Sequence, residues 1–467
     1  MKTSWKIFHY LLYVVIISMI LISVMTFNTS VSYATGWKAG VSSVIITPDK
    51  PVWMAGYGNR DKPSEGKIHD IHVKALAFED PDGNRAVIVT ADLISVMLDF
   101  SNRVAKTIEN RYGLPRENIL FNTSHTHCGP ESRLPLLFYI PVEKGGRIEE
   151  YVQWLETKYV EAVSAAITDL KPAQIQFTSI NPVPFAVSRR LPSPEGILYR
   201  SGPSSYYTGG LRDDTVPVLS VKSADGTIRA ILFGYACHPI TLNIYKFCGD
   251  YPGFAQQYIE EAYPGATALF VQGCAGQLVP NARFQLEYAM GHGRALADAV
   301  TKALEGEQMP VTGHIAGAYE EVICDHEPLP DRKVFEGNLN SKNVVERRQA
   351  AYFLKKMDNN EPINESVPCP LQVLRLGDEV LLVGLFGEPV VEYAVRFKSE
   401  NLTYKFIWVA GYCNDGLGYL PTWQIQREGG YEGGDAMRHM PFTGPYTETV
   451  EKRVVDGVRK LVENVSE

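Results

Sequence analysis

Short apolar runs rich in β-branched residues alternate with helical stretches along most of this 467-residue chain. Residues 85–96 read RAVIVTADLISV, which predicts a buried strand, and the periodicity of residues 100–112 predicts the helix that follows it. The same reasoning predicts strands at 118–123, 215–221, 227–236, 266–272 and 406–411, a hairpin over 371–386, and helices at 150–170 and 286–304. Strands that alternate with helices indicate a mixed α/β (α+β) fold. We find no internal repeat and no composition shift within residues 35–467, so we expect one large domain.

Two segments carry a different pattern. Residues 331–360 alternate Arg, Lys, Glu and Asp, which is typical of a solvent-exposed helix with loops. Residues 191–210 are rich in Pro, Ser, Gly and Tyr, and they predict a long loop. We therefore expect both segments at the surface of the domain.

The N-terminus predicts export. Lys2 and Lys6 precede an uncharged apolar run over residues 10–27, and a polar stretch then ends at Ala34. A basic start, an apolar centre and small residues before a break are the marks of a cleaved secretory signal peptide. The apolar run is close to the shortest length that spans a bilayer, so a retained membrane anchor is the alternative. We expect residues 1–34 to be a signal peptide and residues 35–467 to be secreted or otherwise extracytoplasmic.

Charge and cysteine content exclude some classes of function. The formal net charge is −8 at pH 7 and Arg and Lys form no cluster, so we expect no nucleic-acid partner. The seven cysteines are scattered without a CxxC spacing, which signals neither a zinc knuckle nor a redox pair. Their odd number leaves at least one thiol unpaired within the chain. The composition carries no signal of an oligomeric state.

The sharpest local feature is the sequence SHTHCGP at residues 124–130, directly after a predicted strand. His125 and His127 are two residues apart on an extended chain, so their side chains point to the same face. One can bind a metal ion while the other lies beside it and reaches a substrate. The Gly-Pro that follows ends the strand and places the pair at the mouth of a loop, where functional residues concentrate. A single histidine is usually structural, but two within three residues favour a site.

Three further features stand at the ends of apolar runs or beside glycines. His238 follows a strand in YACHP, Glu388 stands in GEP after residues 380–386, and Tyr419 stands in GLGYLP. Each has a structural explanation of its own: a core histidine, a glutamate in the first turn of a helix, and a turn around glycine. Taken with the histidine pair, they are nitrogen and oxygen ligands at separate strand-to-loop junctions. That arrangement, with one position left for water, is expected of a catalytic zinc site.

These residues and their order resemble the neutral/alkaline non-lysosomal ceramidases. The shared elements are HTHxGP, the histidine of YACHPI, GxxxPN at 276–281, the Gly-Glu at 387–388 and the Tyr…Tyr-Glu-Gly pair. The opening motifs GV…ITP, MAGY and TADL, between residues 40 and 93, resemble the same family. The similarity extends over about residues 37–435 and implies that residues 35–467 are the family's catalytic domain.

The resemblance also implies roles for individual residues. It implies four zinc ligands, which are His125, His238, Glu388 and Tyr419. It implies that His127 lies beside the metal-bound water and serves as the acid–base residue. Tyr431 is expected to hydrogen-bond the substrate carbonyl oxygen and Arg189 to position the substrate, with Arg190 as an adjacent alternative to Arg189. A backbone group of Gly56 is expected to contact the substrate.

Three departures from the family pattern concern the substrate. GxxSPN reads GQLVPN here, so Val279 stands at the position of the family's proposed serine nucleophile. HTHS reads HTHC, which puts Cys128 beside the histidine pair. The chain ends at Glu467, and we expect no C-terminal immunoglobulin-like domain. We therefore expect the protein to cleave N-acyl amides but to act poorly on long-chain ceramide.

The resulting hypothesis is a secreted zinc-dependent hydrolase of N-acyl amide bonds. Its substrate would be N-acylsphingosine or a related lipid or small-molecule amide, and peripheral contact with a membrane surface is left open. Three alternatives remain: a zinc-dependent esterase or other hydrolase that uses the same site, a thiol hydrolase that pairs Cys128 with His127, and a non-catalytic secreted protein that retains the fold. Stoichiometric metal in the purified protein would favour the zinc-dependent hypotheses.

Overall fold

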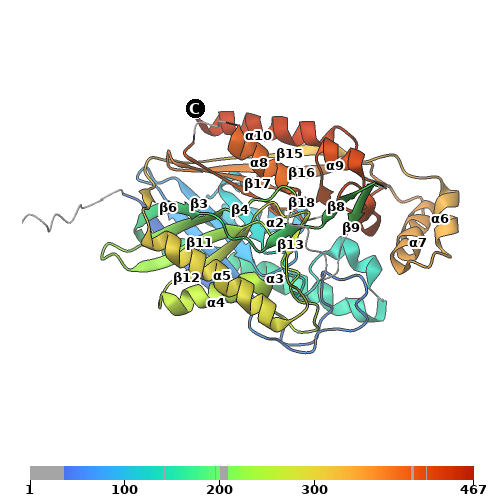
Figure 1. Cartoon of the computed structure of the whole chain (residues 1–467), viewed down its shortest axis with the longest axis horizontal. Helices are drawn as coiled ribbons and strands as arrows, with labels where there is room; N and C mark the ends of the chain where they lie inside the picture. The colour runs from blue at the N-terminus through green and yellow to red at the C-terminus, as the bar shows by residue number, and fades with distance from the viewer. Residues whose placement is uncertain are drawn as a thin grey trace, which may run out of the picture. The chain divides into compact units, whose positions relative to one another are not determined.

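Three β-sheets form the centre of the protein (Figure 1). The computed structural model describes residues 36–140, 142–194, 196–199, 209–400, 404–416 and 418–466. The first sheet contains β1 (Lys38–Ile45), β2 (His72–Glu79), β3 (Arg85–Ala91) and β4 (Ile119–Thr123). The second contains β6 (Gln174–Ile180), β10 (Val216–Lys222), β11 (Ile228–Tyr235) and β12 (Thr267–Gln272). The third contains β15 (Ile315–Asp325), β16 (Ser366–Leu376), β17 (Val380–Leu385) and β19 (Phe406–Ala410).

All three sheets share one topology. In each, the first three strands are antiparallel neighbours and the fourth runs parallel to the third. The third and fourth strands are connected by α2 (Leu98–Tyr112), α4 (Asp250–Ala262) and α8 (Val391–Ser399) in turn. A longer helix comes after the fourth strand of each sheet. It is α3 (Val142–Thr168) in the first sheet, α5 (Leu286–Glu305) in the second and α10 (Val450–Ser466) in the third. Because parallel neighbours require a crossover connection, each sheet contains a β-α-β unit whose two strands end at the same edge.

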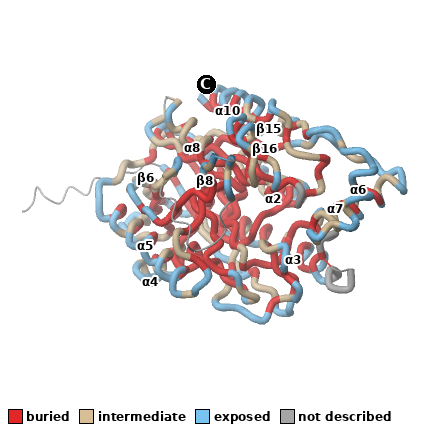
Figure 2. Tube along the Cα trace, turned by 45° about the vertical axis from the view of Figure 1, so that its right-hand side comes forward, coloured by how far each residue is buried: buried red, intermediate tan, exposed pale blue. Residues whose placement is uncertain are grey.

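The inner faces of the three sheets pack against one another, and the helices cover the outer faces (Figures 1 and 2). Leu76, Leu232 and Leu382, one from each sheet, belong to the inner cluster. The outer face of the first sheet packs on α2 and α3, that of the second on α4 and α5, and that of the third on α8 and α10. Strands buried on both faces read as nearly continuous apolar runs, which explains the sequences of β3 and β17.

Shorter elements complete the fold. The two-residue strands β5 (Lys171–Pro172) and β14 (Met309–Pro310) extend the first and second sheets. The small pairs are β7 (Ala186–Ser188) with β13 (Leu278–Pro280), β8 (Arg190–Ser193) with β9 (Gly196–Tyr199), and β18 (Glu388–Pro389) with β20 (Tyr419–Leu420). The remaining helices are η1 (Arg116–Asn118), η2 (Leu134–Tyr139), α6 (Arg332–Asn338), α7 (Val344–Asp358), α9 (Trp423–Glu428) and η3 (Asp435–His439). Figure 1 shows α6 and α7 beyond the edge of the sheets, on the right.

The predicted mixed α/β fold is confirmed, with differences at particular elements. The strand expected over 85–96 ends at Ala91, where the chain leaves the sheet and the Asp92 side chain accepts a hydrogen bond from the His72 backbone N–H at 3.0 Å. The charged segment 331–360 forms two helices, α6 and α7, that share a small apolar cluster. The β8–β9 hairpin occupies part of the predicted loop 191–210, and residues 200–208 lie outside the described residues.

The predicted signal peptide, residues 1–34, lies outside the described residues. Within the part of the chain that the structure describes, no helix has both the length and the apolar character needed to cross a bilayer. The division into a signal peptide and a domain over 35–467 therefore stays a prediction.

Candidate active site

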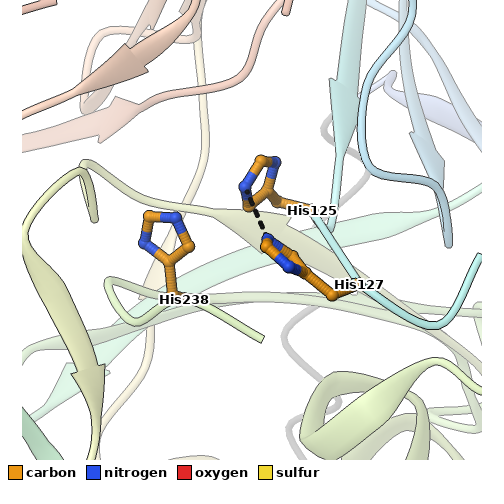
Figure 3. Close-up of side chains that lie close together, drawn as sticks. All are labelled: His125, His127 and His238. Carbon is orange, nitrogen blue, oxygen red and sulfur yellow. Dashed lines mark hydrogen bonds between the residues drawn. The ribbon is translucent and has the colours of Figure 1, made fainter. Parts of the chain in front are cut away.

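Loops that follow the parallel strands bring the predicted ligands to one place. His125 follows β4, His238 follows β11 and Glu388 follows β17, so each of the three sheets supplies one side chain. Tyr419 opens β20, which pairs in parallel with Glu388 in β18. Figure 3 shows the imidazoles of His125, His127 and His238 converging. Sites at the carboxyl ends of parallel strands are usual in α/β folds, and here three such ends meet.

The backbone and one ring nitrogen fix the orientation of two histidines. His125 has φ +63°, a left-handed conformation that non-glycine residues rarely adopt, and its N–H donates to the Leu93 carbonyl at 2.9 Å. Its Nδ1 lies 2.8 Å from the Ile94 carbonyl oxygen, and Nδ1 of His238 lies 2.6 Å from that of Ala275. Donation from Nδ1 to a carbonyl leaves the Nε2 lone pair available as a ligand.

The spacing of the donor atoms fits a tetrahedral metal ion. Glu388 Oε2 lies 3.3 Å from His125 Nε2 and 2.9 Å from His238 Nε2. Tyr419 Oη lies 3.5 Å from His238 Nε2. A zinc ion with bonds of about 2.0–2.1 Å in tetrahedral geometry holds its ligand atoms about 3.3 Å apart. These separations fit a tetrahedral metal ion held by nitrogen and oxygen donors of the four residues.

His127 is a further candidate ligand. Its Nε2 lies 3.3 Å from His125 Nε2, and the three histidines offer ligand atoms within 4.8 Å of one another. Its Nδ1 is buried and has no hydrogen-bond partner among the described residues. The imidazole is therefore close enough either to ligate an ion or to act on groups beside it.

Electrostatics favour the protonation state that a cation requires. Burial, reinforced by His125 and His238, holds the pKa of His127 well below its usual value. Burial, with Arg189 nearby, lowers the pKa of His238 to about 4. Burial alone would raise the pKa of the Glu388 carboxyl, but the adjacent imidazoles of His125 and His238 outweigh it and hold this pKa well below the usual value. Neutral imidazoles and an ionised carboxylate are the forms that bind metals.

Arg189 lies behind Tyr419 rather than in the pocket lining. Its Nη2 donates to Tyr419 Oη at 2.9 Å and to the Gly276 carbonyl at 2.7 Å, and its Nε donates to Glu432 Oε1 at 2.6 Å. Its guanidinium carbon lies 5.2 Å from the centroid of the Tyr431 ring. Arg190 donates to the opposite oxygen of Glu432 at 3.1 Å. Of the two neighbouring arginines, Arg189 is therefore the one that contacts a candidate ligand.

A pocket opens at this cluster. Its lining includes His125, His127, Glu388, Tyr419 and Tyr431, and its cavity volume is about 180 Å³. Gly56 also lines it with φ +95°, and a Cβ at that position would lie 2.5 Å from Cγ of His127. Only glycine allows the backbone to approach the imidazole so closely. Of the four residues predicted to bind or act on the substrate, Gly56, His127 and Tyr431 line the pocket, whereas Arg189 is not among the described lining residues.

Comparison with known proteins agrees with this geometry. Residues 37–329 match the family profile described as neutral/alkaline non-lysosomal ceramidase, N-terminal. The chain belongs to this family. It is 26% identical to the neutral ceramidase of Mycobacterium tuberculosis over 251 residues, which are 49% of this chain and 38% of that protein. It is 24% identical to neutral ceramidase B of Dictyostelium discoideum over 277 residues, covering 55% and 37% respectively.

The fold matches that of a solved relative. The crystal structure of neutral ceramidase from Pseudomonas aeruginosa superposes with a TM-score of 0.72 at 19% identity, covering 92% of this chain and 75% of that chain. The curated relatives are matched over well under half of their own length, 38% and 37% for the two named above. The likeness therefore establishes the family and the fold.

The two positions that depart from the ceramidase pattern lie away from the pocket lining. Val279 packs in an apolar cluster with Val187 and Ile240, and it is not among the described lining residues. The Cys128 thiol is 3.8 Å from the Leu242 carbonyl oxygen, and burial raises its pKa to about 12. A thiol with that pKa holds little thiolate at neutral pH, which disfavours a thiol nucleophile. All seven cysteines are unpaired and buried.

Several site residues of this ceramidase-family protein were not assigned a role from the sequence. The ring of Tyr412 lies 4.5 Å from that of His125, centroid to centroid. Glu432 holds Arg189, and Arg60 donates to the His127 carbonyl at 2.7 Å. Their partners are distant along the chain, so no local pattern marks them. Only Glu432, which adjoins Tyr431, stands inside a motif that the sequence had singled out.

Proposed function

We propose that this protein is an exported zinc-dependent amidohydrolase that cleaves N-acyl amide bonds, as in N-acylsphingosine or a related acyl amide. The observation that carries this proposal is the convergence of His125, His238, Glu388 and Tyr419 with donor atoms 2.9–3.5 Å apart beside a pocket. Membership of the ceramidase family supports the reaction type. The names of the relatives support ceramide or a similar lipid amide as the substrate class.

Different residues of the site would take different roles in amide hydrolysis. Bound zinc would supply Lewis-acid activation of water and of the scissile carbonyl near neutral pH. His127, beside the ligand cluster, would carry a proton to the leaving amine. Tyr431 would donate a hydrogen bond to the substrate carbonyl oxygen as negative charge develops there. Arg189 would hold the Tyr419 hydroxyl, and Gly56 leaves space for the substrate against His127.

Metal analysis tests the proposal most directly. We expect one zinc per chain in the purified protein, and we expect His125→Ala and His238→Ala to lose both zinc and amidase activity, because each removes one tetrahedral ligand. His314→Ala is the matched control, since its side chain is 55% exposed and pairs with Asp82. Full zinc content in both site variants would contradict the ligand assignment. Zinc-loaded protein that cleaves acyl esters but no acyl amide would favour the esterase alternative.

Variants at the two departing positions test the choice of nucleophile. We expect Val279→Ser and Cys128→Ser each to change kcat/KM for an N-acyl amide by less than about threefold, because activated water needs no nucleophilic side chain. The measurement is amine release by the zinc-loaded variants. A large gain in Val279→Ser would show that the serine matters. A zinc-loaded but inactive Cys128→Ser protein would revive the thiol mechanism.

Export is proposed on the pattern of residues 1–34, a basic start followed by an apolar run and small residues. Expression in a secreting host should release protein whose N-terminus begins near residue 35. N-terminal sequencing of the protein in the medium measures this. Full-length protein retained in the membrane fraction would favour the anchor alternative.

A further inference from the structure

The α6–α7 hairpin differs in charge from the rest of the protein. Residues 331–360 contain seven Lys and Arg against four Asp and Glu, a formal net charge of +3, whereas the whole chain has a net charge of −8. Figure 1 shows the hairpin beyond the edge of the sheets, and Figure 2 shows exposed residues along much of it. A basic segment on an otherwise acidic protein indicates a surface that attracts anionic partners.

Two lysines of the hairpin are exposed and have no ion-pair partner among the described residues. Lys333 lies on α6, and Lys342 lies in the connection from α6 to α7. Arg332, by contrast, is paired with Glu336 at 2.8 Å and with Asp358 at 2.7 Å. The positive charge that the hairpin offers to a partner therefore includes Lys333 and Lys342.

Exposed apolar side chains stand beside these lysines. Val334 follows Lys333 on α6 and is 49% exposed, and Leu339, where α6 ends, is 43% exposed. Neither belongs to the apolar cluster that holds the hairpin together, which is made of Phe335, Ala350, Phe353 and Leu354. Exposed cations interspersed with exposed apolar side chains are typical of segments that lie at the surface of a membrane, where the cations meet headgroups and the apolar groups enter the acyl boundary.

The same hairpin forms part of the pocket wall beside the candidate metal ligands. Val345, in the first turn of α7, lines the pocket, and its Cγ2 would lie 3.8 Å from a Cβ at Gly58, which also lines it. Gln349, one turn further along α7, donates to the carbonyl of Met440, another lining residue, at 3.1 Å. Lys342 precedes Val345 by only three residues. The exposed basic and apolar part of the hairpin is therefore continuous along the chain with the pocket wall.

We propose that the α6–α7 hairpin docks this protein on a bilayer that contains anionic lipids, so that the pocket meets a lipid amide at the membrane surface. The inference rests on the lipid-amide substrate of the proposed function. An anionic bilayer matches both features of the hairpin, because its headgroups attract Lys333 and Lys342 and its acyl boundary accepts Val334 and Leu339. A soluble polyanion would pair with the lysines and leave the apolar side chains in water.

Two lysines and two apolar side chains give a reversible attachment. Each lysine near an anionic leaflet strengthens binding about fivefold, and this attraction falls off within a Debye length of about 8 Å at physiological ionic strength. The apolar side chains add a contribution that salt does not screen. Docking should therefore depend on both the lipid composition and the salt concentration.

Vesicle sedimentation tests the inference with the full protein and needs no catalysis. The vesicles consist of phosphatidylcholine alone or of phosphatidylcholine with a minority of phosphatidylglycerol. We expect binding to the anionic vesicles to be at least about tenfold stronger, with most of the difference lost at high salt. Equal binding to the two kinds of vesicle overturns the inference.

Paired variants locate the docking surface. Lys333→Gln with Lys342→Gln, and separately Val334→Ser with Leu339→Ser, should each weaken binding to anionic vesicles at least about fivefold. All four side chains are exposed, so Tm should be unchanged in both pairs, which shows that the variants are folded. Lys106→Gln with Lys302→Gln is the matched control. It removes two charges from exposed positions on α2 and α5 and should leave vesicle binding within about twofold.

The possible outcomes separate this inference from the proposed function. Folded hairpin variants that bind anionic vesicles as tightly as the unaltered protein overturn the role of the hairpin. A loss in the lysine pair without a loss in the apolar pair overturns the bilayer as the partner and favours a soluble polyanion. Vesicle binding that follows the expectations, without hydrolysis of any acyl amide, overturns the proposed function and leaves docking of the hairpin standing.

Discussion

A buried tyrosine, arginine and glutamate form a chain of charge and hydrogen bonds behind the candidate metal ligands. Burial holds the pKa of the Tyr419 hydroxyl well above its usual value, and Arg189, which donates to that hydroxyl, acts in the opposite direction. The Arg189 guanidinium is itself buried, and Glu432, which is 1% exposed, supplies a carboxylate beside it. Glu432 therefore acts on the site through Arg189 and is a positioning residue.

The hydrogen-bonded series of Tyr419, Arg189 and Glu432 predicts a defined kinetic effect of Glu432→Gln. Breaking one partner of a buried charge pair costs roughly 2 kcal/mol or more, which corresponds to about a thirtyfold loss in rate. We expect the loss in kcat for an N-acyl amide, with KM changed less and zinc content unchanged. Glu428→Gln is the control, because Glu428 pairs with Arg190 at 3.0 Å and accepts a hydrogen bond from Gln424 at 2.8 Å, and its side chain is 35% exposed. Equal losses in the two variants would show that Glu432 acts through general stability instead.

At the scale of elements, the ends of the fourth strands of the three sheets are joined by one side chain. Asn122, the next-to-last residue of β4, accepts a hydrogen bond from the Gln272 N–H of β12 at 2.9 Å. Its amide nitrogen donates to the carbonyl of Gly411, directly after β19, at 2.7 Å. His125 directly follows β4, and β12 and β19 are the parallel neighbours of β11 and β17, after which His238 and Glu388 stand. The three-sheet junction thus depends on a buried amide that satisfies backbone groups of its neighbours.

Asn122→Ala should therefore destabilise the whole junction. The substitution leaves the buried Gln272 N–H and the Gly411 carbonyl without their partner, and each such group costs about 1–3 kcal/mol. We expect the free energy of unfolding to fall by about 3 kcal/mol in urea titrations, with weaker zinc binding, because the ligand loops lose their common anchor. Asn340→Ala, at an exposed position between α6 and α7, should change stability by less than about 0.5 kcal/mol. An Asn122→Ala protein as stable as this control would contradict the role of the junction.

The same junction shows which parts of the site could be predicted from sequence. His125, His127, His238 and Glu388 could be found because each polar residue directly follows an apolar strand, which is a local signal. Asn122 could not, because it lies inside a strand and its partners are 150 and 289 residues away along the chain. The fold class followed from alternating strands and helices. The shared topology of the three sheets could not be predicted from the sequence. The three sheets have the same order and direction of strands, but their amino-acid sequences are not repeated.

At the scale of the whole molecule, the candidate metal site lies where three topologically equivalent units meet. His125 comes from the first sheet, His238 from the second, and Glu388 and Tyr419 from the third. The inner faces of the same sheets share one apolar cluster. A metal ion at the site would therefore connect the three units at one end of that cluster. Ligands drawn from all three units couple metal binding to the stability of the whole fold rather than to one loop.

Removing the metal should accordingly lower the melting temperature of the entire domain. An ion present at about a thousand times its dissociation constant stabilises the folded state by about 4 kcal/mol. For a chain of this size that corresponds to about 4 °C in Tm, given an unfolding entropy of about 2 cal/mol/K per residue. We expect EDTA to lower Tm by this amount in one cooperative transition, and added zinc to restore it. His125→Ala, His238→Ala and Glu388→Ala each remove a ligand from a different sheet, so all three variants should lose the zinc-dependent increase in Tm. A Tm shift that survives in any one of them would mean that the ion is held without that sheet.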